Sequence, residues 1–149
     1  MSLFDTISED IKKAMLARDH VALEALRGIK KEFLEAKTAK GTDGELHDDA
    51  ALKILQKMIK QRRESAEMYV AGKRQDLADA ELAQAEIIAR YLPQQMNPEQ
   101  ITEALKQIIA ELGATSMADM GKVMGFASKQ LAGKADGKAI STIVRQLLA

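Results

Sequence analysis

The lysines and glycines near the C-terminal end are the residues whose types and spacing could do chemistry. The segment Gly133-Lys134-Ala135-Asp136-Gly137-Lys138 places two glycines and two lysines where a helix is expected to begin. Backbone N–H groups and lysines at a helix N-terminus bind phosphate. The spacing excludes a Walker A loop, because three residues separate the glycines and Lys138 is followed by alanine. The segment therefore suits an isolated phosphate of a polyanion; the commoner interpretation is a glycine turn in which Asp136 caps the last helix.

Charge supports a local, not a global, interaction with polyanions. The chain has 149 residues with 22 Lys plus Arg and 22 Asp plus Glu, so its net charge attracts neither nucleic acid nor an anionic membrane. From residue 114 onward, five cations accompany only two acids, Asp119 and Asp136. These five cations form a modest positive end of the chain: Lys122, Lys129, Lys134, Lys138 and Arg145.

A second basic stripe lies in the first half of the chain. Lys53, Lys57 and Lys60 are spaced to share one face of a predicted helix, in which Arg62 and Arg63 follow with no acid among the five. Such a stripe can neutralise phosphates, but it is more often a solvated helix face. Aromatic residues make up only 3% of the chain, so we expect no aromatic platform on which bases of single-stranded RNA could stack.

Gly121 and Gly125 lie four residues apart in a predicted helix, where each glycine costs up to about 1 kcal/mol relative to alanine. Glycines at this spacing share one face, so either another helix or a ligand should approach the backbone closely there. Packing of another helix is the commoner explanation. Together with Gly133 and Gly137, these glycines are the predicted positions of close approach.

Other site chemistries have little support in the sequence. The chain has no cysteine, which excludes disulfides, thiolate metal sites and cysteine nucleophiles. His20 and His47 lie outside any ligand spacing such as HExxH, and both fall at predicted helix starts. Ser65, Ser128 and Ser141 lie within predicted helices with no histidine nearby in sequence. We therefore predict no catalytic residue, no metal and no cofactor.

The N-terminal residues lack a charged segment followed by an apolar one, and no stretch approaches 18 uninterrupted apolar residues. We expect no exported form, no membrane partner and a cytoplasmic location.

Hydrophobic periodicity predicts an all-α protein in which nothing resembles a strand. Four helices are expected before the first proline, at residues 4–17, about 19–38, about 48–71 and 76–91. Ser2 and Asp19 are suited to cap the first two, and Gly72 to end the third.

The two prolines, Pro93 and Pro98, mark the clearest boundary in the chain. After it, Asn97 can cap a helix that has Pro98 at its first position and stops at Gly113. Two more helices are expected, from about Ser116 or Asp119 to Gln130 and from near Asp136 to the C-terminus. We predict an N-terminal unit at 1–75, a helical linker at 76–96 and a C-terminal three-helix unit at 97–149.

Several segments resemble the YqeY family. Residues 57–65, KMIKQRRES, and 90–95, RYLPQQ, are similar to its KMIKQRxES and YLPxQ segments. Residues 119–125 and 133–138 resemble its C-terminal signature, so the resemblance spans nearly the whole chain. It implies two different three-helix units joined by a partly helical linker.

The C-terminal part also resembles the tail domain of the B subunit of tRNA-dependent amidotransferases, mainly over residues 133–148. It departs from that tail at Asp136-Gly137, where the tail has Asn-Pro. In the amidotransferase the tail contacts the outer corner of the tRNA, whereas kinase and amidase parts missing here do the chemistry. The resemblance implies tRNA contact for Lys122, Lys134, Lys138 and Arg145 without that chemistry.

Three functions follow as hypotheses. The first, based on the tail resemblance and the positive C-terminal end, is a non-catalytic accessory module that binds tRNA or another RNA. Its predicted RNA-binding residues are Lys122, Lys129, Lys134, Lys138 and Arg145. The second is a module that docks on another protein of translation through the methionine-rich helix 117–131. The third, a glutamine-dependent carbon–nitrogen ligase, rests on family association alone, and we expect no such activity.

Overall fold

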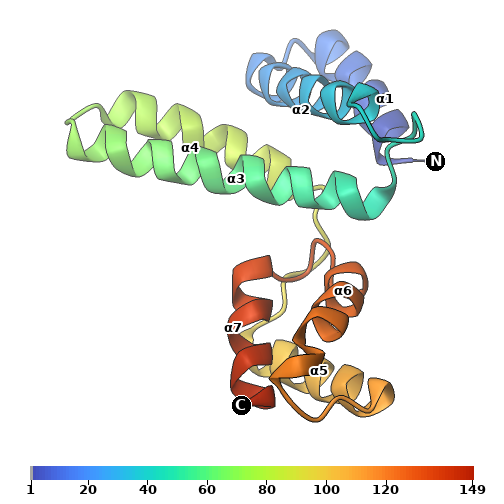
Figure 1. Cartoon of the computed structure of the whole chain (residues 1–149). Coiled ribbons are helices and arrows are strands. Elements are labelled where there is room, and N and C mark those ends of the chain that lie inside the picture. The colour runs from blue at the N-terminus through green and yellow to red at the C-terminus, as the bar shows by residue number, and fades with distance from the viewer. Residues whose placement is uncertain (1) are drawn as a thin grey trace. The chain divides into compact units, whose positions relative to one another are not determined.

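The computed structural model describes residues 2–149, and within that range it contains seven α-helices, one 3-10 turn and no strand (Figure 1). The all-α prediction is confirmed. The chain divides into two compact units, with the boundary between Leu92 and Pro93. No helix in the described range is long and apolar enough to cross a membrane.

Four helices build the first unit: α1 (Leu3–Ala17), α2 (His20–Thr38), α3 (Asp48–Ala71) and α4 (Gln75–Ala89). Side chains at the predicted positions cap the first two. Ser2 Oγ accepts a hydrogen bond from the Asp5 N–H at 3.2 Å, and Asp19 Oδ1 accepts one from the Ala22 N–H at 3.1 Å. Each bond satisfies a backbone donor that the helix leaves unpaired.

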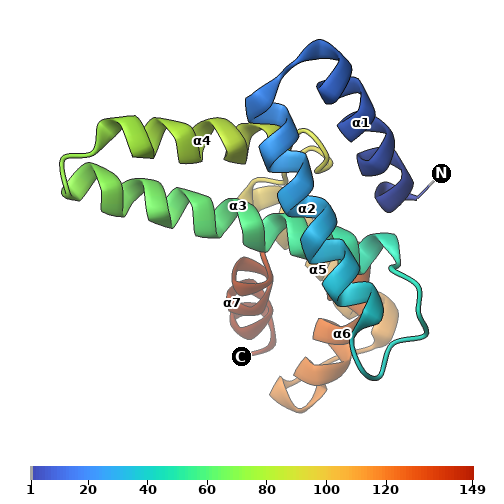
Figure 2. The ribbon, with the colours of Figure 1, turned by 90° about the horizontal axis from the view of Figure 1, so that it is seen from above.

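Helices α3 and α4 form an antiparallel hairpin across a short turn after Gly72, and α2 crosses the pair (Figures 1 and 2). Helix α1 packs against α2. Their shared core has Ile7, Ile29, Phe33, Leu55 and Ile88 as fully buried large side chains.

Helix α4 belongs to this core, whereas the sequence predicted a linker at 76–96. Ala78 and Ile88 are fully buried and Ala85 is 2% exposed. Ala85 is seven residues after Ala78, and Ile88 is three residues after Ala85, so the three form a stripe along one face of the helix. Small alanines in that stripe let α4 approach α3 closely. The first unit therefore has four helices, one more than the resemblance implied.

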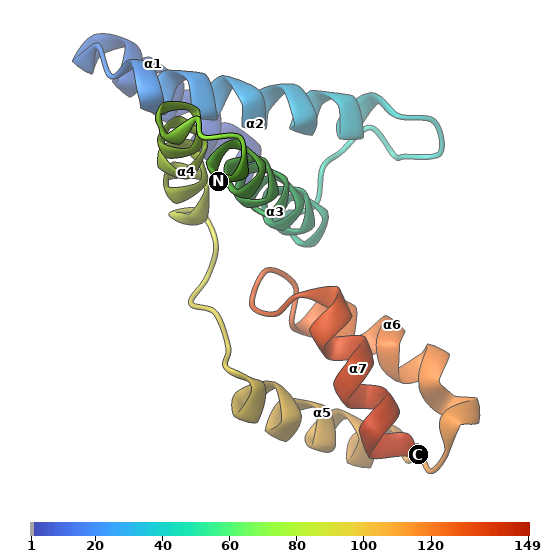
Figure 3. The same cartoon turned by 90° about the vertical axis from the view of Figure 1, so that its left-hand side faces the viewer.

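The second unit contains α5 (Pro98–Leu112), the 3-10 turn η1 (Met117–Asp119), α6 (Met120–Gln130) and α7 (Gly137–Leu148) (Figure 3). Asn97 and Gln100 form the reciprocal capping box that begins α5, with Pro98 at the first position. Gly113 ends α5 with φ 66°, a left-handed conformation that suits glycine. All three α-helices contact one another around a core that includes Leu105, Ile108, Val123 and Val144.

Candidate nucleic-acid interface

The predicted RNA-binding cations lie on the two last helices and in the turn between them. Lys122 and Lys129 lie on α6, Lys138 and Arg145 on α7, and Lys134 in the connecting turn; all five are exposed. Within each helix the two cations are seven residues apart, so they lie on nearly the same face. The opposite face of each helix is buried, with Val123 on α6 and Val144 on α7 both 0% exposed.

None of these five cations makes an ion pair with any residue in the range 2–149. The acid nearest α6, Asp119, has a carboxylate oxygen that accepts a hydrogen bond from the Thr115 N–H at 3.0 Å. In contrast, Lys106 on α5 lies 3.6 Å from the carboxylate of Glu103. The positive charges on α6 and α7 are therefore available to an anionic ligand.

The start of α7 differs from the capped turn that the sequence suggested. Asp136 occupies the N-cap position, but its side chain makes no capping hydrogen bond. The helix begins at Gly137, and Lys138 follows at its second position. A helix N-terminus without a side-chain cap keeps N–H donors open to a phosphate.

Gly133 has a structural role in the turn before α7. Its φ is 76°, which favours glycine, and its carbonyl accepts a hydrogen bond from Gln95 Nε2 at 2.7 Å. Next to it, the Lys134 carbonyl accepts a bond from the Met96 N–H at 2.9 Å. The segment that follows Pro93 is thus tied to the turn that carries Lys134.

Gly121, Gly125 and Gly137 are open to solvent. A Cβ added at any of them would meet no atom of the described chain within 4 Å, apart from its chain neighbours and the backbone of its own helix. The expectation that another helix packs on Gly121 and Gly125 is therefore wrong for the helices of the second unit, all of which lie in the described range. Close approach by a ligand at these glycines stays a prediction.

The second basic stripe lies on an exposed face of α3, and Arg62 is not part of it. Lys53, Lys57 and Lys60 are exposed on α3. Arg62 lies on the opposite side, with its side chain only 22% exposed and its Nη1 donating to Glu81 Oε2 of α4 at 3.3 Å. Its position three residues after Ile59 and seven after Leu55, both core residues, is the sequence signal that was missed.

Arg62 also explains a glycine in α2. A Cβ added at Gly28 would lie 3.3 Å from Arg62 Nη2 and 3.8 Å from Met58 Cε. Arg62 therefore lies across α2 where the side chain of residue 28 would project. This arginine, part of the KMIKQRRES segment, joins three helices of the first unit.

A hydrogen bond between distant parts of the chain was not anticipated either. The Tyr91 hydroxyl, in the RYLPQQ segment, donates to Asp10 Oδ2 of α1 at 2.5 Å. Burial and this bond raise the pKa of Tyr91 above its ordinary value. The bond fixes the end of the first unit to its first helix.

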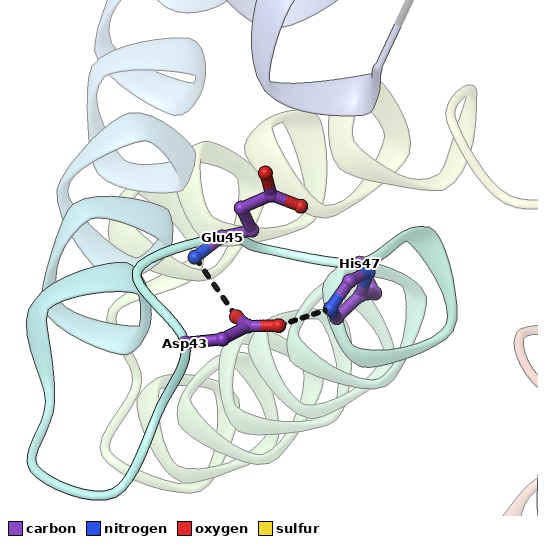
Figure 4. A group of neighbouring side chains, drawn as sticks. All are labelled: Asp43, Glu45 and His47. Carbon is purple, nitrogen blue, oxygen red and sulfur yellow. Dashed lines mark hydrogen bonds and ion pairs between the residues drawn. The ribbon is translucent and has the colours of Figure 1, made fainter.

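The loop before α3 brings together Asp43, Glu45 and His47, each offering one ligand atom within 4.8 Å of the others (Figure 4). The Asp43 carboxylate contacts both other residues. It lies 2.9 Å from His47 Nε2 and accepts a hydrogen bond from the Glu45 N–H at 3.0 Å. The side-chain bond raises the pKa of His47 and lowers that of Asp43. All three residues are exposed, as is common for acidic groups that bind no ion, so the prediction of no metal stays as it was.

The prediction of no catalytic residue stays a prediction, and the histidines bear on only one type of arrangement. His47 is bonded to Asp43, and across residues 2–149 no histidine ring is hydrogen bonded to a serine hydroxyl. Acyl-transfer nucleophiles of the serine type need such a base within reach.

Comparison with known proteins finds one family model that covers both units. A family model described as "Yqey-like protein" matches residues 4–148. The curated protein "Altered inheritance of mitochondria protein 41, mitochondrial" of Clavispora lusitaniae is 30% identical over 132 residues, which cover 87% of this chain and 74% of that protein. Proteins of the same name are 29% identical in Pyrenophora tritici-repentis, covering 95% and 78% of the two chains, and 32% identical in Meyerozyma guilliermondii, covering 82% and 65%.

Proposed function

This chain belongs to the YqeY-like protein family, and from that premise we propose that it is a non-catalytic accessory protein that binds tRNA or another RNA through its second unit. One observation carries the proposal. Five exposed cations lie on α6, α7 and the turn between them, and they form no ion pair among the residues that the structure describes.

Unpaired cations favour a polyanionic ligand for an energetic reason. An exposed lysine that already has a carboxylate partner would exchange one ion pair for another, with little gain. An unpaired lysine that binds a phosphate also releases the counterions condensed on the nucleic acid. The open start of α7, beside Lys134 and Lys138, adds backbone donors to the same ligand.

The test is a gel-shift titration of the purified chain with bulk tRNA at low and moderate salt. We expect binding that weakens as salt rises, because phosphate contacts dominate. One variant replaces both Lys122 and Lys129 by glutamine, and a second replaces both Lys138 and Arg145 by glutamine. Each should weaken tRNA binding and lower the slope of log affinity against log salt concentration by about one for each phosphate that it no longer neutralises. Absence of binding at low salt contradicts the proposal.

The matched control is Lys106→Gln in the same unit. Lys106 is exposed like the five cations but is paired with Glu103 at 3.6 Å. We expect this variant to bind tRNA with the wild-type salt slope. If Lys106→Gln loses as much tRNA affinity as the α6 and α7 variants do, net charge alone, and not the proposed surface, governs binding.

A protein partner is the second candidate, and exposed apolar side chains of η1 and α6 favour it. Met117 in η1 and Phe126 in α6 are each 46% exposed. Such a surface, with adaptable methionine, suits docking on another protein of translation. A pull-down that survives RNase and is lost in a Met117→Ser variant would favour this candidate over RNA.

Absence of catalysis is part of the proposal and has its own assay. We expect no glutamine-dependent amide formation on misacylated tRNA by the purified chain. Sustained product formation that scales with the concentration of this chain would contradict the proposal.

The compartment also needs a test, because the matched relatives are named as mitochondrial proteins whereas the sequence led us to expect the cytoplasm. We propose that the protein acts where translation takes place, the mitochondrial matrix included. Fractionation with ribosomal markers of each compartment decides between them.

A further inference from the structure

The second unit contains one aromatic residue, Phe126, and its side chain is 46% exposed on α6. Val123 and Ala127, about 60° and 100° around the helix axis from Phe126, are both 0% exposed and form part of the core. Phe126 therefore lies at the edge of the buried face of α6, outside the core cluster itself. An aromatic ring left half in water makes a surface onto which a flat ligand can pack.

Two lysines flank this ring. Lys122 is four residues before Phe126 and Lys129 three residues after it, which places all three side chains within a sector of about 60° and about 10 Å along the helix axis. Both lysines are exposed, and neither makes an ion pair among residues 2–149. Helix α6 itself contains no Asp or Glu. The exposed ring thus lies in a strip of uniformly positive charge, which is complementary to a polyanion.

Space beside the ring is open as well. Gly125 lies about 100° around α6 from Phe126 and about 40° from Lys129, so it borders the strip, and a Cβ added there would meet no atom of another element within 4 Å. A planar group that stacks on Phe126 therefore has room to extend over the helix backbone.

We infer that Lys122, Phe126 and Lys129 bind an unpaired stretch of RNA, with one base stacked on the Phe126 ring and the lysines contacting the flanking phosphates. This inference rests on the proposed function and narrows it to unpaired nucleotides. Bases within a duplex are already stacked on each other, whereas every unpaired base presents a free π-face. The expectation of no stacking platform, based on the low aromatic content, is revised by the exposure of this one ring.

A docked peptide helix fits this strip less well. Helix-in-groove recognition uses several apolar anchors at spacings of three, four and seven residues, received by a hydrophobic groove. The exposed face of α6 offers a single ring between two charges. Surface ion pairs from the lysines to an acidic peptide would add little affinity.

Fluorescence anisotropy with the full chain at low salt tests the inference. The probes are a labelled short oligouridylate and an RNA duplex of the same length. Replacing Phe126 by alanine should weaken binding of the single strand by roughly 5- to 150-fold, the effect of losing one stacked base, and leave the duplex affinity unchanged. Leu82→Ala, at a side chain that is 45% exposed on α4, is the matched control and should bind as the wild type does.

A second variant reports stacking directly and does not depend on loss of binding. The chain has no tryptophan, so Phe126→Trp introduces a single indole at the proposed contact. We expect this variant to bind the single strand at least as tightly as the wild type, with saturable quenching of its fluorescence. Oligoglutamate, an acidic chain without bases, should neither quench the indole nor displace the RNA at the same charge concentration.

The outcomes separate this inference from the function on which it rests. If the wild type binds neither RNA probe, the proposed RNA-binding function fails and the inference fails with it. If the wild type binds RNA but Phe126→Ala binds the single strand equally well, or the indole is not quenched, the stacking inference alone is overturned. Equal quenching by oligoglutamate likewise overturns it.

Discussion

Replacement of Gly28 by alanine tests how Arg62 joins the helices of the first unit. In the interior of a helix this substitution normally stabilises by about 1 kcal/mol, because alanine has the higher helix propensity. Here the new Cβ would lie 3.3 Å from Arg62 Nη2, closer than ordinary van der Waals contact. The guanidinium cannot withdraw freely, since its Nη1 is 3.3 Å from Glu81 Oε2.

The expected change in the free energy of unfolding depends on how exposed the Arg62–Glu81 ion pair is. The side chains of Arg62 and Glu81 are 22% and 26% exposed, so the pair lies between a solvent-screened pair and a buried one. Discounted for solvent, its loss costs about 1 kcal/mol. Gly28→Ala in the wild type should therefore change stability by about 0 kcal/mol, because the gain in propensity is offset by displacement of Arg62.

The same substitution has a different effect when Arg62 is methionine. Methionine can follow the apolar face of α3 without holding Glu81, and it removes the Arg62 Nε, a buried donor with no hydrogen-bond partner. In that background, Gly28→Ala should stabilise by the full propensity gain of about 1 kcal/mol. The coupling between the two positions is thus also about 1 kcal/mol.

Urea unfolding of the four proteins in this cycle measures the coupling. Tyrosine fluorescence isolates the relevant transition, because the chain's two tyrosines, Tyr69 and Tyr91, both lie in the first unit. If Gly28→Ala stabilises the wild type and the Arg62→Met variant equally, Arg62 does not occupy the space above Gly28, and the reasoning is refuted.

Three further predictions concern substitutions of single residues. Tyr91→Phe removes the bond to Asp10 and should destabilise the first unit by about 1 to 2 kcal/mol in urea unfolding. Burial and that bond raise the pKa of Tyr91 in the folded state, so its contribution to the free energy of unfolding is full below about pH 10 and is lost at higher pH. In Tyr91→Phe, stability should therefore fall less steeply at alkaline pH. An unchanged dependence of stability on pH would contradict the assignment. Gly125→Ala, at an unobstructed helix position, should stabilise the second unit by up to about 1 kcal/mol by circular dichroism, whereas a loss would indicate a hidden contact. Asp43→Asn should lower the pKa of His47 towards its ordinary value in an NMR titration; an unchanged value would mean that the pair does not persist in solution.

Features decided by neighbouring residues could be predicted from the sequence. The caps at Ser2, Asp19 and Asn97 lie where they were expected, because a capping side chain bonds to a backbone donor only two or three residues away. The prolines likewise restrict the chain locally, and the break between the two units falls at Pro93.

The candidate interface was predictable in its residue types but not in its geometry. The exposed lysines of α6 and α7 were chosen by charge and spacing alone. Phe126 was missed because α6 carries apolar residues on several sides, and periodicity does not say which of them the bundle covers. The contacts of α6 with α5 and α7 bury the face of Val123 and leave the Phe126 side chain 46% exposed.

The sequence by itself determined where this chain is helical, where its helices begin and that a break lies at Pro93. Only the tertiary structure decided that α4 completes the first core and that Arg62 of the basic run faces inward to Glu81. It also decided that, among the described residues of the second unit, no helix packs on Gly121 and Gly125. The physical reason is the range of the interactions. Periodicity, caps and breakers act within a few residues, whereas the choice of buried face depends on which elements meet after the chain has folded.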